Sequence, residues 1–201
     1  GFAGQRSVSP VVDITNYIVL ELGQPMHAYD LDKVAGGALT VRFAAAGESC
    51  DLLDGRTVPL AADELVIADA AGPVALAGVM GGVRTSVTAE TRRVLFEVAW
   101  FAPAAIAGRG RRHGLTTDAS QRFERGVDPE IGRVAIERAT ALTLVIAGGE
   151  AGPVETAEAQ GVVGGSVRPA SLVTLRPAQV KRLLGLEPSA ARIVELLSRL
   201  G

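Results

Sequence analysis

The stretch Gly23-Gln24-Pro25-Met26-His27-Ala28-Tyr29-Asp30 contains one of only two histidines in the chain and directly follows a segment with a helical pattern. In residues 11–22 the apolar side chains recur at the spacing of one helical face, at Val11, Ile14, Ile18 and Leu22. Ser9-Pro10 predicts an N-cap with proline at the first helical position, and Gly23 predicts the end of this helix. Pro25 then predicts an extended chain up to His27.

His27 has two interpretations. A histidine held just beyond a helix end can act on a substrate, because its pKa suits proton transfer near neutral pH. It can equally be structural, capping the helix or bonding to a buried carbonyl. Taken alone, the stretch favours the structural interpretation and leaves the functional one open.

The composition predicts a globular protein. The chain has 201 residues, of which 48% are hydrophobic and 21% charged, enough for one ordinary domain plus a fragment, or for two small domains. No apolar run approaches the ~18 residues of a membrane span, and no basic segment precedes an apolar stretch as in a signal peptide. Cys50 is the only cysteine, which predicts a reducing cytoplasm.

Two classes of site are disfavoured by the same numbers. One cysteine and two histidines do not supply a convincing zinc site. A net charge of −2 argues against broad electrostatic binding of nucleic acid, so any such contact is expected to be local.

Between residues 39 and 101 the pattern changes to that of strands. Strands are expected at 39–43, 64–68, 74–79 and 93–101, and Asp54-Gly55 predicts a hairpin turn within 51–58. The run 93–101 is nearly continuously apolar, which predicts a strand buried on both faces.

Glu97 interrupts that apolar run. A buried carboxylate costs several kcal/mol unless it is paired or faces a cavity. Glu97 therefore either forms an ion pair with one of the arginines or is the single acceptor on the floor of a pocket, and the sequence does not decide between the two.

The pair Gly81-Gly82 follows another apolar strand. Such glycines allow a positive φ and the close approach of a backbone or a ligand, but a plain turn explains them equally, and alone we take them as a turn. No phosphate-loop or dinucleotide pattern accompanies them.

The remaining segments are predicted to be mostly helical. A helix is expected over 103–112, ending in a solvated basic cluster at Arg109, Arg111 and Arg112. A longer helix is expected from Asp128-Pro129-Glu130 to Gly148, with apolar residues at Val134, Ala135, Ala139, Leu142 and Ile146.

The C-terminal part is expected to start a separate domain. A linker over 150–165 is followed by an expected strand over 166–175 and helices over 177–184 and 189–200. This tail of about 35 residues is too short to bury a core alone. We therefore expect residues 1–150 to form one domain, 151–165 a linker, and 166–201 the first part of a small helical domain.

Four blocks of the sequence carry a family resemblance. They begin at Val12-Asp13-Ile14-Thr15-Asn16-Tyr17 with the opening stretch, and continue in residues 76–82, 95–101 and 122–129. In order and spacing, over residues 5–150, they resemble the central editing domain of the β subunit of bacterial phenylalanyl-tRNA synthetase. The resemblance implies an α+β fold in layers, around a β-sandwich of unusual topology. The tail from about Ser166 in turn resembles the start of the next β-subunit domain, a small helical module.

The resemblance implies a function as well. It is proofreading hydrolysis of the ester in tyrosyl-tRNA(Phe), with the mischarged amino acid on the 3′-terminal adenosine of the tRNA. The implied site residues are Arg6, Thr15 and His27 for catalysis and Gly81, Glu97, Thr117 and Ala119 for substrate binding. Glu97 is implied to bind the tyrosine hydroxyl, and the small residues to leave room for its ring. Relatives often carry histidine in place of Gln121 and glutamate in place of Asp118.

The implied context is a cytoplasmic heterotetramer with the synthetase α subunit and no membrane. ATP and Mg²⁺ serve the parent enzyme, whereas no cofactor is expected for this part. A non-catalytic scaffold contacting the catalytic subunit and tRNA is the alternative. His27 remains open as base, water-positioner or ligand clamp, and as a neutral imidazole it is expected to lose function as the pH falls through about 6.5.

Overall fold

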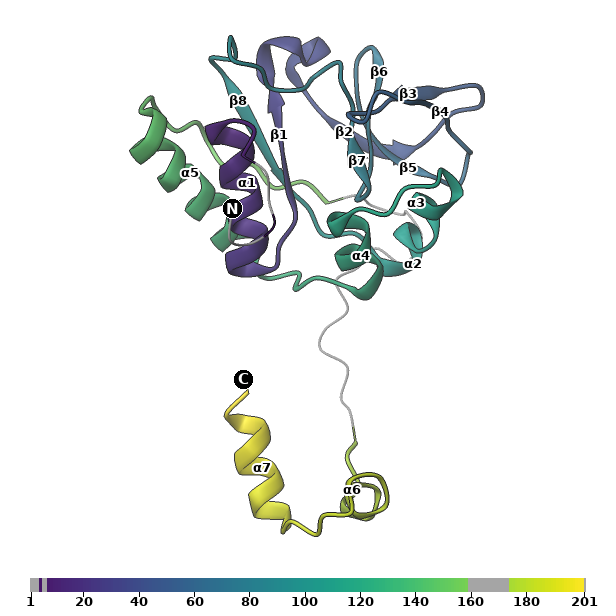
Figure 1. The fold of residues 1–201 in the computed structure, drawn as a ribbon, viewed down its shortest axis with the longest axis vertical. Coiled ribbons are helices and arrows are strands. Elements are labelled where there is room, and N and C mark those ends of the chain that lie inside the picture. Colours follow the sequence, from purple (N-terminus) through teal and green to yellow (C-terminus); the bar gives the residue numbers. More distant parts are fainter. Residues whose placement is uncertain (1–3, 5–6, 159–173, 201) are drawn as a thin grey trace. The chain divides into compact units, whose positions relative to one another are not determined.

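The computed structural model describes residues 4, 7–158 and 174–200. The chain divides into two compact units, Gly1–Gly165 and Ser166–Gly201. The first unit combines helices with antiparallel strands (Figure 1), so the predicted α+β class is confirmed.

The first helix, α1 (Pro10–Leu22), begins and ends as the sequence predicts. The Ser9 side chain accepts a hydrogen bond from the backbone N–H of Val12 at 3.4 Å, and Pro10 occupies the first turn. Gly23 ends the helix with φ 73° and donates its N–H to the Val19 carbonyl at 3.0 Å. The left-handed conformation at this position is one that glycine adopts without strain.

The opening stretch continues as a strand. β1 (Met26–Asp30) pairs antiparallel with β8 (Val94–Val98), and the two form a separate two-stranded ribbon. The prediction that the second strand is buried on both faces is wrong, because all residues of β8 are partly exposed. One face of the ribbon is covered by helices, whereas the other opens onto a pocket.

The covering helices are α1 and α5 (Gly132–Ala147), which lie side by side (Figure 1). Ile14 and Ile18 of α1 meet Ala135 and Ala139 of α5 in a small core, against which Met26 and Val98 pack. Alternate residues of a strand point to opposite faces. His27 and Glu97 therefore point away from this core.

The start of α5 differs from the prediction. The helix begins at Gly132, because the Asp128 carboxylate accepts the Glu130 N–H at 2.9 Å and closes a turn. Its end at Gly148 is confirmed. On its predicted apolar face Ala135 and Ala139 are buried and Leu142 packs against them, but Val134 and Ile146 are exposed.

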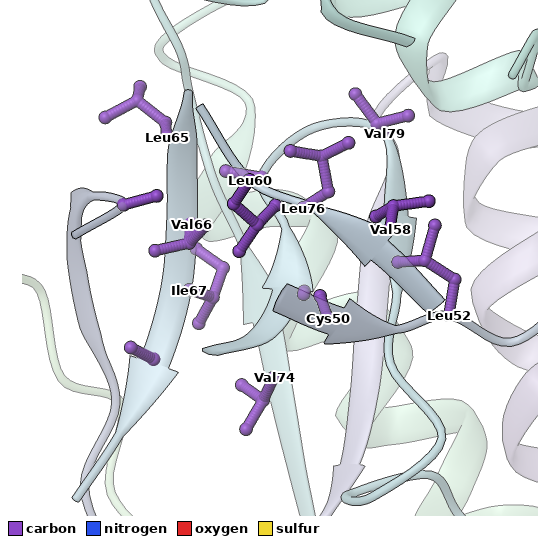
Figure 2. Packing of buried hydrophobic residues seen from close by; sticks show 14 of the residues in the cluster. Cys50, Leu52, Val58, Leu60, Leu65, Val66, Ile67, Val74, Leu76 and Val79 are labelled. Atoms are coloured by element: carbon purple, nitrogen blue, oxygen red, sulfur yellow. The ribbon is translucent and has the colours of Figure 1, made fainter. Parts of the chain in front are cut away.

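A second layer holds the main core. β2 (Thr40–Phe43), β5 (Leu65–Asp69), β6 (Gly72–Leu76) and β7 (Met80–Gly81) form one sheet in that order, beside the hairpin of β3 (Ser49–Asp51) and β4 (Thr57–Pro59). Short 3₁₀ turns, η1 (Leu31–Lys33) and η2 (Ala35–Gly37), connect β1 to β2. Apolar side chains of the sheet and the hairpin, including Leu52, Val66 and Leu76, fill the space between them (Figure 2). The predicted hairpin turn is confirmed, with Gly55 at φ 85°.

Three short helices follow β8. The helix predicted over 103–112 is broken at Gly108 (φ 77°) into α2 (Pro103–Ile106) and α3 (Arg109–Arg112), and α4 (Asp118–Arg125) comes next. The basic cluster is not merely solvated, since Arg109 and Arg112 both bind Asp63, at 2.8 and 2.7 Å.

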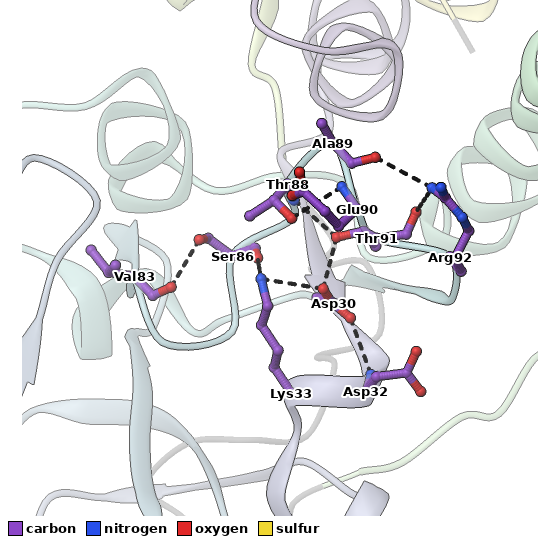
Figure 3. A network of polar contacts seen from close by, with 10 residues as sticks. All are labelled: Asp30, Asp32, Lys33, Val83, Ser86, Thr88, Ala89, Glu90, Thr91 and Arg92. Atoms are coloured by element: carbon purple, nitrogen blue, oxygen red, sulfur yellow. Dashed lines mark hydrogen bonds and ion pairs between the residues drawn. The ribbon is translucent and has the colours of Figure 1, made fainter.

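A polar network fixes the end of β1 (Figure 3). The Asp30 carboxylate accepts the Thr91 hydroxyl at 2.7 Å and pairs with Lys33 at 3.2 Å, while Lys33 also donates to the Ser86 carbonyl at 2.8 Å. The loop 83–92 is thereby tied to the ribbon, which anchors the strand that carries His27.

The second unit holds α6 (Pro177–Leu184) and α7 (Ala190–Ser198), so both predicted helices are confirmed. No residue within 174–200 is buried, and leucines such as Leu183 and Leu200 are strongly exposed. The expected strand over 166–175 falls almost wholly outside the described residues. In the expected linker, residues 150–158 form no helix or strand, and residues 159–165 lie outside the described residues. No helix that the structure describes is long and apolar enough to cross a membrane.

Candidate functional site

A pocket of about 80 Å³ lies between the β1–β8 ribbon, the edge of the main sheet and α4. Four residues singled out from the sequence line it: His27, Gly81, Glu97 and Ala119. The other lining residues are mainly apolar, namely Pro25, Met26, Tyr29, Ile67, Ala75, Leu76, Ala77, Gly78, Val79, Met80, Phe101 and Phe123. The pocket is thus an apolar hollow with three polar side chains, those of His27, Tyr29 and Glu97.

The strand register brings those three side chains together. His27 lies directly opposite Glu97, and Tyr29 lies opposite Leu95, which makes it the diagonal neighbour of Glu97. The Tyr29 hydroxyl donates to Glu97 Oε2 at 2.5 Å. The rings of His27 and Tyr29 meet edge to face, with centroids 4.6 Å apart and planes at 74°.

Glu97 forms no ion pair with an arginine among residues 4, 7–158 and 174–200, so that interpretation finds no support there. Glu97 lines the apolar pocket, and the residue as a whole is partly exposed. Burial raises the pKa of Glu97, and the hydrogen bond from Tyr29 lowers it in part. Of the two interpretations, the arrangement matches the pocket acceptor.

His27 does not cap the helix, because the Gly23 N–H makes the closing hydrogen bond of α1. Its Nε2 atom is buried and has no hydrogen-bond partner in the part of the chain that the structure describes. Burial lowers the pKa of His27 from 6.5 to about 4. The imidazole is therefore half protonated near pH 4 and neutral at neutral pH, so its pKa lies below the 6.5 expected from the sequence.

Gly81 and Gly82 permit close approach, and the interpretation as a plain turn is wrong. A Cβ atom at Gly81 would lie 2.5 Å from His27 Nε2, and one at Gly82 would lie 2.6 Å from the Val74 carbonyl oxygen. Neither glycine has a positive φ. Only a residue without a side chain leaves room for His27 at this point.

Thr117 and Ala119 both lie at the start of α4. The Thr117 side chain accepts the Ser120 N–H at 3.0 Å in a capping box and donates to the Val79 carbonyl at 2.8 Å. Thr117 therefore holds α4 against the segment that contains Gly81, while Ala119 itself lines the pocket. Thr117 is not among the lining residues.

Of the two other residues predicted for catalysis, Thr15 does not line the pocket. Thr15 is buried in α1, and its hydroxyl donates to the Val12 carbonyl at 2.8 Å within the same helix. Arg6 lies outside the described residues.

Tyr29 is the residue that the sequence reasoning missed. It is fully buried and supplies the hydrogen bond of Glu97. Had residues 26–30 been predicted as a strand, the two-residue period from His27 would have placed Tyr29 on the same face.

A larger groove, of about 450 Å³, runs along another side of α4. Asp118 and Gln121, the two departures from the family pattern, both line it, together with Arg122 and Arg125. Arg122 binds Asp118 at 3.1 Å, whereas Arg125 forms no ion pair with the residues that are described. The groove thus offers a cation beside the pocket.

The described residues contain no candidate metal site. No group of three or more His, Cys, Asp and Glu side chains there is arranged to hold an ion. Burial raises the pKa of the Cys50 thiol to about 11, so that side chain is no ready nucleophile either.

Comparison with known proteins decides the family. The model of the B3/4 domain matches residues 2–148. The chain belongs to the B3/4 domain family. This B3/4 domain is 50% identical over 198 residues to the phenylalanine–tRNA ligase β subunit of Yersinia pestis, which covers 98% of the chain and 24% of that relative. The β subunit of Nitrosococcus oceani is also 50% identical, over 200 residues, 99% of the chain and 24% of the relative.

The resemblance stated from the four sequence blocks is thereby confirmed. The B3/4 match ends at residue 148, within the first compact unit. The chain spans about a quarter of the length of the relatives it matches, 24% in each case.

Proposed function

We propose that this B3/4 domain is the proofreading part of a phenylalanine–tRNA ligase β subunit and hydrolyses the ester of tyrosyl-tRNA(Phe). One observation carries the proposal. Glu97 holds a carboxylate in an apolar pocket and already accepts a phenol hydroxyl, that of Tyr29, at 2.5 Å. A second phenol, on a substrate, suits the same acceptor, because a carboxylate has about four lone-pair sites.

Selectivity follows from the physics of hydroxyl recognition. A pocket built for phenylalanine rejects a ring with an added hydroxyl only ~10²-fold. A second site that binds through the hydroxyl discriminates by ~10⁴–10⁵-fold, because a ligand without it leaves a buried polar group unpaired. Glu97 is such a group. The small side chain of Ala119 leaves room for the ring, while Gly81 leaves room for the His27 ring at the same pocket.

His27 is the proposed partner of the attacking water. Its buried Nε2 has no partner among the described residues, so a neutral imidazole with its proton on Nδ1 would offer the Nε2 lone pair to a water or to the RNA 3′ end. A pKa of about 4 makes a weak base at neutral pH. That favours a water-positioner or ligand clamp over a general base. An aminoacyl ester is already activated, and among the described residues no Ser or Cys lines the pocket to act as nucleophile.

The other assignments rest on the family. Thr15 requires a rotation of its side chain before its hydroxyl leaves the Val12 carbonyl, and Arg6 remains a proposed contact to the substrate. Thr117 acts through the position of α4. The RNA strand next to the ester would lie in the groove along α4, where Arg125 can meet a phosphate.

The rest of the enzyme is proposed from the relatives. An α subunit, ATP and Mg²⁺ would serve aminoacylation elsewhere in a cytoplasmic synthetase, and this domain would need no cofactor. We also propose that residues 151–165 link it to a small helical domain that begins at residue 166, because the leucines of α6 and α7 have no core of their own.

The test compares two esters in the full-length protein that contains this chain. Wild-type protein should deacylate tyrosyl-tRNA(Phe) far faster than phenylalanyl-tRNA(Phe), and Glu97→Ala should remove most of that preference. If Glu97→Ala keeps the wild-type ratio, the role of Glu97 is wrong. If the wild-type protein accelerates neither ester, the domain is the non-catalytic scaffold.

A further inference from the structure

Tyr29 combines features that neither the family resemblance nor the relatives explain. It is fully buried in the main core, and its hydroxyl is its only polar side-chain atom. That hydroxyl donates its hydrogen bond to Glu97 Oε2. A phenylalanine would fill the same core space, so the hydroxyl itself needs a reason.

The geometry of the ribbon makes this contact rigid. Tyr29 reaches Glu97 diagonally across the β1–β8 pair, and its backbone also bridges to Ser86. The next residue, Asp30, is held by Thr91 and Lys33 (Figure 3). The ring stacks edge to face on His27. A ring fixed on these sides holds the carboxylate in one orientation.

The two oxygens of Glu97 are consequently different. Oε2 is occupied by Tyr29, whereas Oε1 has no hydrogen-bond partner among the described residues and is not among their buried unpaired atoms. One oxygen is therefore committed to the fold, and the other has no partner among the described residues.

We propose that Tyr29 is the positioning residue for Glu97: its hydroxyl fixes Oε2 so that Oε1 is presented to the hydroxyl of a tyrosyl ester. The proposal rests on the proposed function and deepens it, since it assigns a further residue that determines specificity. Tyr29 acts through Glu97 and need not touch the substrate.

The hydroxyl of Tyr29 also opposes the effect of burial on the charge of Glu97. Burial raises the pKa of Tyr29, so its phenol stays protonated and always donates. Donation to a carboxylate favours the charged form and lowers the pKa of Glu97 against the effect of burial. A charged acceptor binds a hydroxyl about twice as strongly as a neutral one.

The other groups around Glu97 do not replace this effect. Besides Glu97 and Tyr29, His27 is the only titratable side chain among the described residues of the pocket lining, and it is neutral at neutral pH. The main sheet, the segment 77–81 and α4 present apolar residues to the pocket, and α5 packs on the far face of β8 through Ala135 and Ala139.

The experiment is Tyr29→Phe in the full-length protein, with tyrosyl and phenylalanyl ester hydrolysis measured from pH 5 to pH 9. The preference for the tyrosyl ester should fall by about tenfold, the loss expected for one charge-assisted hydrogen bond. In addition, the preference that remains should weaken at a higher pH than in the wild type, because Glu97 without its donor is protonated more easily. A merely structural role of the hydroxyl would not move this pH profile.

Tyr17→Phe is the matched control. Tyr17 is exposed on α1 and donates to Glu21 Oε1 at 3.0 Å, so the variant also removes a tyrosine–glutamate hydrogen bond, but far from the pocket lining. It should keep the wild-type ratio and profile.

Glu97→Ala separates this inference from the proposed function. If Glu97→Ala loses the preference while Tyr29→Phe keeps both ratio and profile, the inference is overturned and the proposed function stands. If Glu97→Ala keeps the preference, the assigned role of Glu97 fails and the inference fails with it. A Tyr29→Phe protein that does not fold would assign the hydroxyl to stability and overturn the positioning role.

Discussion

Both histidines of the chain lie beside a glutamate, and the two pairs are built in opposite ways. His113 Nε2 is 2.8 Å from Glu64 Oε1, Arg112 lies 3.3 Å from the same oxygen, and Oε2 accepts the Ala61 N–H at 2.9 Å. Glu64 is fully buried and fully partnered. This pair joins α3 to the loop that precedes β5.

The pair of His27 and Glu97 is left open. The two residues face each other across the ribbon, yet His27 Nε2 has no partner among the described residues and Glu97 has only the Tyr29 hydroxyl. Unpaired buried polar groups cost free energy, so a fold retains them where a ligand completes them. Partnered groups are expected to serve stability, and unpartnered ones to serve a substrate.

The largest effect on stability is expected for Glu64→Ala. The change leaves the buried His113 ring and the Ala61 N–H without their acceptor, and a buried polar group left unpaired costs about 1–3 kcal/mol. Arg112 is more exposed and keeps Asp63, so it adds little. Denaturant unfolding measures the loss, which for Glu97→Ala should be clearly smaller. Equal losses would erase the distinction between the pairs.

Gly81→Ala should have the largest effect on catalysis that leaves the fold intact. The new Cβ atom displaces the His27 ring, and a shift of about 1 Å costs on the order of 10²-fold in rate. Gly82→Ala is the control, because its Cβ would meet backbone atoms of Val74 and Asp51 and should lower stability instead. Deacylation rates and melting curves are measured for both variants. A Gly81→Ala protein that hydrolyses the ester at the wild-type rate would refute this prediction.

His27 should also appear in the pH dependence of stability. Its pKa is lower in the folded protein, about 4, than its usual 6.5, so protonation favours the unfolded chain. The penalty for burying a protonated His27 is absent above pH 6.5 and grows as the pH falls toward 4, to about 3 kcal/mol at most. The free energy of unfolding of wild type minus His27→Ala, measured from pH 7 to pH 4, should decline. A flat difference would mean that His27 is solvated.

Thr117→Val should produce the smallest change. It removes the N-cap of α4 and the hydroxyl bond to Val79, which predicts a loss of about 1 kcal/mol in stability. Thr117→Ser should restore most of it. Thermal melts and deacylation rates check this. A Thr117→Val protein with wild-type stability but a strongly reduced deacylation rate would contradict the structural role.

The sequence predicted best those features that depend on neighbouring residues. Ser9 and Gly23 determine the ends of α1 through bonds within a few residues, and Asp54-Gly55 does the same for its hairpin. Asp128 failed as a cap because its carboxylate closes a turn at Glu130, and both outcomes are compatible with the same local sequence.

The arrangement of the candidate site depends on contacts between residues far apart in the chain, which no local sequence pattern reveals. His27 and Glu97 meet only through the register of two strands far apart in the chain, and the hydroxyl of Tyr29 reaches Glu97 through that same register. The low pKa of His27 likewise depends on burial by distant segments. The family resemblance supplied most of the residues, whereas their physical environment had to come from the structure.

One measurement tests the contrast between the two pairs directly. His27→Ala and His113→Ala are made in the full-length protein, and melting curves and tyrosyl-tRNA(Phe) deacylation rates are taken on the same preparations. His27→Ala should lose roughly 10²-fold or more in rate with little change in stability at pH 7. His113→Ala should lose stability and keep its rate per folded molecule. A His27→Ala protein that is destabilised but hydrolyses the ester at the wild-type rate would contradict the account.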